Sequence, residues 1–326
     1  MSKYDFEIVN YIDFVNEIKY LRSGMKIVYP THEPKYLESL ARIRKVNIIL
    51  IYEKKEPLYY VPLYVSKFKH LLNSAILEMP SEVLVEDYRE MFQSLYLFIR
   101  RKYSFTNFTF NYLDTHLHTS SNILSNNRAI KSEFATNVVD GSWKLSLGVR
   151  RNLKKAEKNN LSVIANPSKS HIYEFYEQCI LNSRARKGIY MHNVNEQDTM
   201  LRFYDELIQS SIGKLILIAD ESDAVVGGSF IVFNDIVCTY YNAGNSPSGL
   251  KMGASYLSVY TGIKFALERG IEYDLFGSYI NRDENYKKLH SFKSQWGREI
   301  PLDQYYVPSN FFISLPLQRR LNTNSS

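Results

Sequence analysis

Apolar positions along the first half of the chain alternate between strand-like and helix-like periods. Residues 46–52 and 58–65 are short apolar runs separated by a charged turn, which predicts two strands. Residues 35–44 and 87–103 carry apolar side chains at helical spacing, and residues 105–112 alternate again. This half is therefore predicted to be mixed α/β, with a helix, a strand pair, a second helix and a further strand.

The second half repeats much of that order with stronger signals. Short apolar runs at residues 214–219, 225–233 and 236–241 predict three strands, and residues 253–269 carry apolar side chains along one helical face. A further strand is predicted at residues 271–276, about 165 positions after the corresponding strand of the first half. The repeated order indicates either an internal duplication or the common alternation of mixed α/β chains.

Length and composition fit a soluble protein of two domains, or of one large domain. The chain has 326 residues, and its 45% hydrophobic and 23% charged residues exclude disordered and fibrous classes. No apolar run approaches the ~18 residues that span a bilayer, and two isolated cysteines cannot form a disulfide framework. We expect a cytoplasmic protein, with peripheral association at the inner membrane face as an option. Its predicted parts are an N-terminal lobe at 1–139, a C-terminal lobe at 140–310 and a tail at 311–326.

Positive charge is concentrated in one segment. The net charge is +6, yet residues 128–158 hold 8 basic and 3 acidic side chains, whereas residues 159–281 hold 9 basic and 13 acidic ones. Within this segment, residues 147–158 are predicted to form a helix with an apolar stripe on one face and five cations on the other: Arg150, Arg151, Lys154, Lys155 and Lys158. The cations repel one another, so phosphates of a nucleotide, a coenzyme or RNA would suit them. The alternative is an ordinary solvated helix face.

Two further segments combine cations, glycines and polar side chains. Arg186 closes a helix with a basic last turn, where it could complement the helix dipole or hold an anion. Tyr241, Asn242 and Gly244 lie where a strand runs into a glycine-containing loop before a helix, which can present backbone N–H groups to a phosphate. The loop fits neither the P-loop nor the dinucleotide-binding spacing, so an ordinary connection is the alternative.

The last segment places a lysine among apolar side chains. Asp274 and Gly277 end an apolar strand, and Lys293 follows between Phe292 and Trp296. A lysine in such a setting can stabilise a developing oxyanion, although a surface lysine beside apolar neighbours is the alternative. The histidines show no paired metal spacing, no serine-hydrolase elbow is present, and both cysteines lie on apolar faces, which predicts core positions.

The order of these segments resembles that of the GNAT-like acyltransferases of the Fem type, a group that includes peptidoglycan-bridge aminoacyltransferases. The resemblance covers roughly residues 140–300 and rests on five segments: residues 150–158, 186–189, 240–244, 266–277 and 292–297. It implies a mixed α/β (α+β) fold of two GNAT-like lobes, each with a mixed, largely antiparallel sheet flanked by helices. Two similar lobes would agree with the internal duplication that the repeated order of helices and strands suggests.

The resemblance also implies acyl transfer to an amino group of a bacterial envelope precursor, such as a nucleotide-activated sugar, a glycan or a peptidoglycan intermediate. The donor would be acyl-CoA, or an aminoacyl-tRNA in the aminoacyl-transferring members, without a metal. This chain lacks the family's long helical arm within residues 189–213 and the Q/RxxGxG/A pyrophosphate signature around residues 248–254. A GNAT-like fold that only binds a nucleotide-sugar or a partner protein is the non-catalytic alternative.

Roles for individual residues follow from the same resemblance. Lys293, in the Phe292-Lys293 pair, would stabilise charge at the reaction centre. Tyr241 would give a proton to the leaving group, and Asp274 is the candidate general base. The remaining candidates would bind donor or acceptor groups: Arg150, Arg151, Lys154, Arg186, Asn242, Gly244, Gly277, Phe292 and Trp296.

Overall fold

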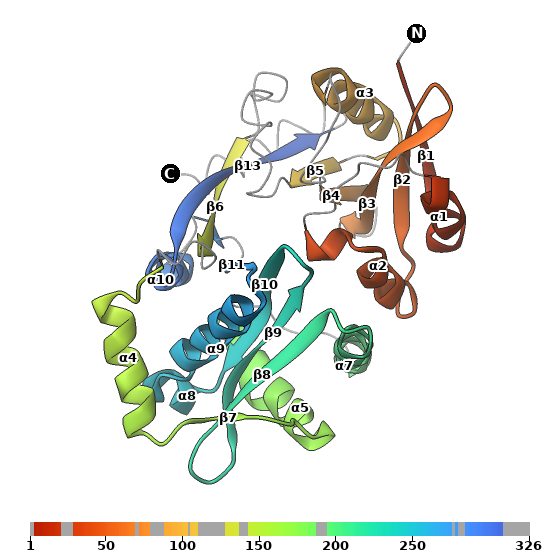
Figure 1. The fold of residues 1–326 in the computed structure, drawn as a ribbon. Helices are drawn as coiled ribbons and strands as arrows, with labels where there is room; N and C mark the ends of the chain where they lie inside the picture. The colour runs from red at the N-terminus through yellow and green to blue at the C-terminus, as the bar shows by residue number, and fades with distance from the viewer. Residues whose placement is uncertain are drawn as a thin grey trace. The chain divides into compact units, whose positions relative to one another are not determined.

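The structure is a computed structural model of the whole chain. It describes residues 3–20, 29–68, 72–78, 88–103, 105–109, 128–136, 143–186, 194–275, 278–279 and 284–308. The chain divides into two compact units (Figure 1). The first comprises Met1–Ser132, Tyr279–Tyr286 and Pro301–Ser326, and the second comprises Glu133–Ser278 and Lys287–Ile300. The chain therefore leaves the first unit and returns to it near the C-terminus.

The described strands of the first unit form a sheet in the order β1-β2-β3-β4-β5-β13. The first four pair antiparallel, β5 lies parallel to β4, and β13 lies antiparallel to β5. Their bounds are β1 (Tyr4–Asn10), β2 (Asn47–Glu53), β3 (Glu56–Phe68), β4 (Leu72–Glu78), β5 (Phe105–Thr109) and β13 (Arg298–Pro308). The helices are α1 (Tyr11–Glu17), α2 (Pro34–Ala41) and α3 (Tyr88–Arg100), with single 3₁₀ turns at Ile18–Tyr20 and Pro30–His32.

Helices cover both faces of this sheet, which explains the uninterrupted apolar run in β2. Ile49 and Ile51 pack in one cluster with Met91 and other α3 side chains. On the opposite face, Tyr60 meets Phe14 of α1, with ring centroids 4.7 Å apart. Strands buried on both faces are apolar at every position rather than at every second one.

The described strands of the second unit follow the order β6-β11-β10-β9-β8-β7. Strands β7 to β10 pair antiparallel, β11 lies parallel to β10, and β6 lies antiparallel to β11. Their bounds are β6 (Arg128–Thr136), β7 (Ser162–Ile164), β8 (Gly213–Ala219), β9 (Val225–Phe233), β10 (Val237–Asn245) and β11 (Glu272–Asp274), and the short β12 (Ser278–Tyr279) follows. The helices are α4 (Leu147–Lys158), α5 (Lys169–Glu174), a π-helix (Phe175–Leu181), α6 (Asn182–Ala185), α7 (Val194–Gln209), α8 (Pro247–Met252), α9 (Ala254–Arg269) and α10 (Glu284–Lys293).

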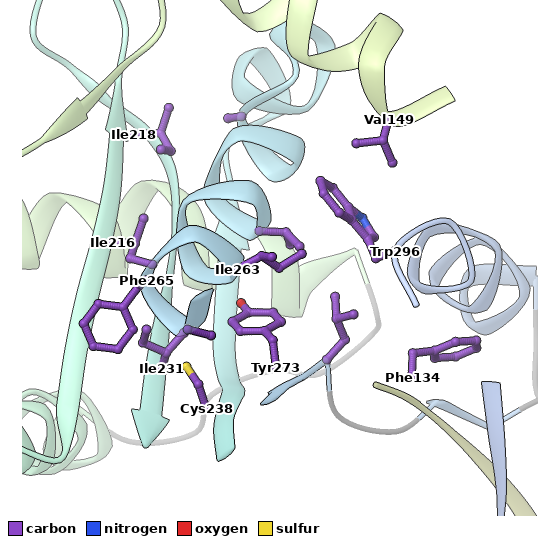
Figure 2. Packing of buried hydrophobic residues seen from close by; sticks show 14 of the residues in the cluster. Phe134, Val149, Ile216, Ile218, Ile231, Cys238, Ile263, Phe265, Tyr273 and Trp296 are labelled. Atoms are coloured by element: carbon purple, nitrogen blue, oxygen red, sulfur yellow. The ribbon is translucent and has the colours of Figure 1, made fainter. Parts of the chain in front are cut away.

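The core of the second unit lies between its sheet and α9. Ile263 of α9, Ile231 of β9, Tyr273 of β11 and Trp296 belong to one buried cluster (Figure 2). On the opposite face of the sheet, Tyr204 of α7 stacks on the ring of β9 residue Phe230, with centroids 4.1 Å apart. Helical layers therefore cover both faces of this sheet as well.

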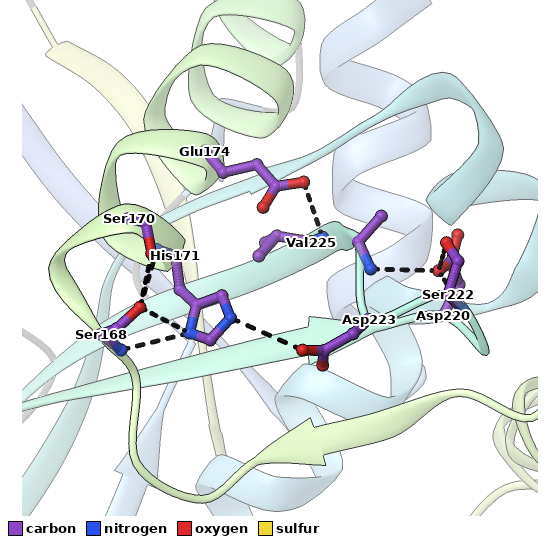
Figure 3. Close-up of polar contacts among 9 residues, drawn as sticks. Ser168, Ser170, His171, Glu174, Asp220, Ser222, Asp223 and Val225 are labelled. Atoms are coloured by element: carbon purple, nitrogen blue, oxygen red, sulfur yellow. Dashed lines mark hydrogen bonds and ion pairs between the residues drawn. The ribbon is translucent and has the colours of Figure 1, made fainter.

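Polar contacts fix the start of α5 against the β8–β9 turn (Figure 3). The Ser168 N–H donates to His171 Nδ1 at 3.1 Å, which closes a capping box at the first turn. His171 Nε2 lies 3.8 Å from a carboxylate oxygen of Asp223, and the Val225 N–H donates to Glu174 Oε1 at 3.0 Å. These contacts hold the continuous helical segment from α5 to α6, which reaches the end of β10.

The two units repeat one topology. Each has a four-stranded antiparallel meander, a helical crossover to a fifth strand parallel to the fourth, and a sixth strand antiparallel to the fifth. The predicted fold class is confirmed: two lobes, each with a mixed, largely antiparallel sheet flanked by helices. The lobe limits at residues 139 and 310 stay a prediction. Across the described helices, none is long and apolar enough to cross a bilayer.

His32 makes the stability of the first unit depend on pH. Burial lowers the pKa of His32 from 6.5 to about 4. The unfolded chain therefore binds a proton at this residue below pH 6.5, whereas the folded chain does so only below about 4. The contribution of the neutral, buried His32 to stability is therefore fully present above pH 6.5 and decreases below it. We expect the free energy of unfolding to fall by up to about 3 kcal/mol as the pH drops to 4.

Urea unfolding of the wild type and of His32→Gln across this pH range measures the effect. The variant should lose that part of the pH dependence, whereas His171→Gln, at a half-buried position, should keep it. Equal pH slopes for the wild type and His32→Gln would contradict the assignment.

Candidate functional site

The candidate site lies where β10 and β11 part. The two strands pair in parallel only from Val237 to Thr239 and from Glu272 to Asp274. β10 continues to Asn245, paired with β9 on its other side, and a β-bulge falls between Tyr240 and Asn242. Among the described residues, the second half of β10 thus has no strand partner on its β11 side. We call this feature the strand divergence. An unpaired strand edge can hydrogen-bond a ligand, but here the Ala243 N–H donates to Asn242 Oδ1 and the Asn245 N–H donates to the Ser183 hydroxyl. The backbone near the bulge at Tyr241 is therefore the candidate contact for a ligand.

Asp274 occupies the last paired position of β11, beside the strand divergence. Its side chain is 0% exposed, and its partners in register are Thr239 and Ala135. Tyr273 and Leu275 belong to the core on the α9 side, so alternation directs Asp274 to the opposite face of the sheet. The Thr239 hydroxyl is also buried, and the described residues offer it no hydrogen-bond partner. A carboxylate and an orphaned hydroxyl thus share one buried face next to the divergence.

Tyr241 and Asn242 contact α7. The Tyr241 ring lies 6.2 Å from that of Phe203. Asn242 Nδ2 donates to the Tyr204 hydroxyl at 2.6 Å, and Asn242 Oδ1 accepts from the Ala243 N–H at 2.9 Å. The Asn242 side-chain amide is thus engaged within the protein, and its backbone is in register with Phe230 of β9.

Gly244 allows the π-helix to pack on β10. A Cβ at this position would lie 2.5 Å from the Cys179 carbonyl carbon, inside any real contact distance. Insertions of π-helix are frequent at functional sites, and this one carries Cys179 onto the strand. Burial raises the pKa of Cys179 to about 12, and burial with the nearby Asp274 raises the pKa of Cys238 well above its ordinary value. Both thiols are buried, as predicted, and neither can serve as a thiolate nucleophile.

Arg186 is tied to the end of β10. Its Nη2 atom donates to the Ser183 hydroxyl at 2.9 Å and to the Asn245 carbonyl at 3.1 Å. The same hydroxyl accepts from the Asn245 N–H at 3.1 Å. Burial lowers the pKa of Arg186, but the guanidinium stays charged. The helix end and the strand end predicted to bind anions are thereby brought together.

The turn after β10 differs from the predicted loop, because it folds into the six-residue helix α8. The Ser246 hydroxyl caps this helix by accepting from the Gly249 N–H at 3.0 Å, and Pro247 at the first position has no N–H. The Ser246 N–H donates to the Val226 carbonyl at 3.0 Å. The amides of Ser246, Gly249 and Leu250 are therefore engaged, and that of Pro247 is absent.

Lys293 is the last residue of α10 and is 5% exposed, which excludes the surface-lysine alternative. Its neighbour Phe292 meets the ring of Tyr256 from α9 at 5.1 Å, and Trp296 lies 5.7 Å from the same ring. The Tyr256 hydroxyl also donates to Gln295 Oε1 at 3.3 Å. Tyr256 thus joins the predicted Phe292 and Trp296 and holds the end of α10 against α9. Gly277 lies outside the described residues.

The basic helix is α4, with the predicted bounds of Leu147 to Lys158. Val149 and Ala156 are buried, and Asn152 faces Gly253 at the start of α9. The five cations are exposed on the other side, and in the described part of the chain none of them makes an ion pair. The structure therefore assembles Tyr241, Asn242, Gly244, Arg186 and Asp274 around the divergence, and leaves these cations on a separate surface.

Sequence patterns gave no sign of three supporting residues. Tyr204, Ser183 and Tyr256 position Asn242, Arg186 and the end of α10, yet each reads in sequence as an ordinary helix residue. Only the spacing of Ser183 and Arg186, three positions apart on one helix, could have suggested their contact. Among the described residues, no group of histidine, cysteine and acidic side chains could hold a metal ion.

Comparisons with known proteins agree with this geometry. Residues 146–288 match the family model described as an acetyltransferase (GNAT) domain. No curated protein sequence gives a match. The fold resembles that of FemX, with a TM-score of 0.64 and 12% identity over 96% of this chain and 100% of that one. It also resembles a tandem GNAT protein from the clavulanic acid biosynthesis pathway, with a TM-score of 0.56 and 6% identity over 94% and 99%.

A third similar structure is the C-terminal domain of a protein described as a lysylphosphatidylglycerol synthetase from Agrobacterium fabrum. It has a TM-score of 0.50 and 11% identity, over 79% of this chain and 83% of that one. The domain match indicates that residues 146–288 form an acyltransferase domain of the GNAT class, and the two structures share the repeated fold of the chain. Within that class, the two-lobed fold is Fem-like.

Proposed function

We propose that this protein is an N-acyltransferase that acylates an amino group of a cell-envelope precursor, such as a nucleotide-activated amino sugar or a glycan. The observation that carries the proposal is the strand divergence, with a bulge at Tyr241 and the buried carboxylate of Asp274 beside it. An acyl carbonyl lying along this edge of β10 would accept a hydrogen bond from a backbone N–H near the bulge at Tyr241, because the N–H groups of Ala243 and Asn245 are engaged. Such bonds orient the carbonyl and strengthen as negative charge develops on its oxygen.

The proposed reaction is direct attack by the amine. The amine nitrogen bonds to the acyl carbon while one of its protons passes to a base, for which Asp274 is the candidate. The bond from carbon to the donor's sulfur or oxygen then breaks, and the departing atom takes a proton from Tyr241. Lys293 would stabilise negative charge in the tetrahedral intermediate, and its burial supports this role because charges interact strongly away from water.

Acyl-CoA is the donor that the GNAT domain match favours. Several amides of the α8 turn are engaged within the protein, so donor phosphates would also need other partners, and Arg186, which is hydrogen-bonded to the end of β10, is one candidate. An aminoacyl-tRNA is the second candidate donor, and the engaged amides of the same turn favour it. The neighbour described as a lysylphosphatidylglycerol synthetase supports an envelope acceptor for this chain.

The donor and acceptor can be tested together by mass spectrometry. The full chain is incubated with a panel of acyl-CoA thioesters or with charged tRNA, and with nucleotide-activated amino sugars as acceptors. We expect an acceptor mass increase equal to one acyl group, and none when the acceptor amine is already acetylated. Transfer from charged tRNA but from none of the acyl-CoA thioesters would identify aminoacyl-tRNA as the donor. Donor binding without transfer to any amine would replace the proposal with the binding-only alternative.

A further inference from the structure

We infer that the cationic face of α4 docks the protein onto an anionic lipid surface. The face consists of the five cations Arg150, Arg151, Lys154, Lys155 and Lys158 together with Leu147. This inference is independent of the proposed acyl transfer. Among the described residues, this face shares no side chain with the groups that line the strand divergence.

The geometry of the helix presents all five cations to one side. At 100° per residue they fall within an arc of about 140°, along about 12 Å of helix axis. Val149 and Ala156 lie on the opposite side and are buried. α4 packs against α9, where Asn152 faces Gly253, and Ser146 caps its first turn (Figure 1). The helix is therefore held by its apolar side, and its cationic face points outward.

These charges are not neutralised by the protein. Each of the five cations is exposed, and across the described residues none forms an ion pair. The one acid on the helix, Glu157, is also exposed and does not pair with them. Like charges one turn apart destabilise a helix, so the stripe is unfavourable unless an anionic partner contacts it.

A flat anionic surface suits this face better than a nucleic acid does. Leu147 lies near the centre of the same arc and is 56% exposed, so an apolar side chain accompanies the cations. Amphipathic helices at lipid surfaces combine cations with such apolar residues. Single-stranded nucleic acids are instead bound by cations alternating with aromatic rings, and helix α4 carries no aromatic residue.

A small-molecule phosphate site is disfavoured by shape. The cavity of about 470 Å³ near the start of α4 is lined by Trp143 and Lys144, but by none of the five cations. Cations on the convex side of one helix cannot surround a single phosphate. They can, however, contact several headgroups of one leaflet at once.

Flotation of the full chain with lipid vesicles tests the inference. The probes are vesicles of phosphatidylcholine mixed with phosphatidylglycerol, and vesicles of phosphatidylcholine alone. We expect binding only to the anionic vesicles, weakened by added salt because screening shortens the reach of the charges. The variant Lys155→Gln/Lys158→Gln should bind about 30-fold more weakly, at about fivefold per cation. Leu147→Gln should weaken binding further.

A matched variant controls for net charge. Lys45→Gln/Lys54→Gln removes two exposed lysines of the first unit and should bind anionic vesicles about as well as the wild type. Circular dichroism checks that every variant is folded. Equal binding by the two double variants, or equal binding to both vesicle types, would overturn the inference. If the protein does not bind vesicles but binds RNA, and this RNA binding is lost in Lys155→Gln/Lys158→Gln, the inference is overturned and the face is an RNA-binding surface.

Discussion

Replacing Lys293 with methionine is expected to lower kcat about 100- to 1,000-fold, the usual effect of removing one oxyanion-stabilising group. The ammonium group would act mainly on charge that exists only in the transition state, so KM for the acyl donor should change little. Methionine suits the test because Lys293 is 5% exposed and alanine would leave a cavity in the core. Steady-state kinetics with the donor and acceptor identified by mass spectrometry measure both parameters.

Lys288→Met is the matched control. Lys288 lies on the same helix but is exposed, so its loss should leave kcat within about twofold of the wild type. Thermal unfolding of both variants separates a loss of activity from a loss of folded protein. Wild-type turnover by a folded Lys293→Met protein would remove this lysine from the mechanism.

Replacing Gly249 with alanine is expected to destabilise the second unit by more than about 3 kcal/mol. A Cβ at Gly249 would collide with the Val226 carbonyl oxygen, which is backbone and cannot rotate away. The same carbonyl accepts from the Ser246 N–H and the Ser246 hydroxyl, so moving it breaks the cap of α8 as well. Urea unfolding gives the change in free energy.

Gly148→Ala provides the comparison. A Cβ there would approach only the Gln295 side-chain oxygen, at 3.0 Å, and that side chain can move. Alanine also favours the helix by about 1 kcal/mol over glycine, so this variant should be neutral or slightly more stable. If Gly249→Ala unfolds at the same urea concentration as Gly148→Ala, Gly249 does not lie against the Val226 carbonyl as described.

Long elements with a clear period could be predicted from the sequence. The bounds of α4 and of β9 agree with the expected 147–158 and 225–233, because an amphipathic stripe and an unbroken apolar run define them. The strands β1, β4, β6 and β7 were not predicted. Each mixes polar with apolar residues, and β7 has only three residues, so pairing with a neighbour rather than local pattern makes them strands.

The candidate site was only partly predictable, for a similar reason. Motif order pointed to Asp274, Tyr241 and Lys293, but the strand divergence depends on where β11 stops pairing with β10, and no local signal encodes that. Ser246 and Pro247 are helix-start residues, so their pattern could have indicated α8 instead of a loop. Contacts between distant segments, such as Asn242 with Tyr204, are absent from any single stretch of sequence.

The return of the chain to its first unit has a consequence during synthesis. β13 pairs with β5 through Gln304 and Thr109, which are 195 positions apart in the chain. At about 5–20 residues per second, a ribosome needs roughly 10–40 s to make the intervening segment. Until then β5 is an open sheet edge, able to pair with other nascent chains. The N-terminal unit, although made first, can therefore be the last to complete its sheet, and slow release of the C-terminus would favour aggregation.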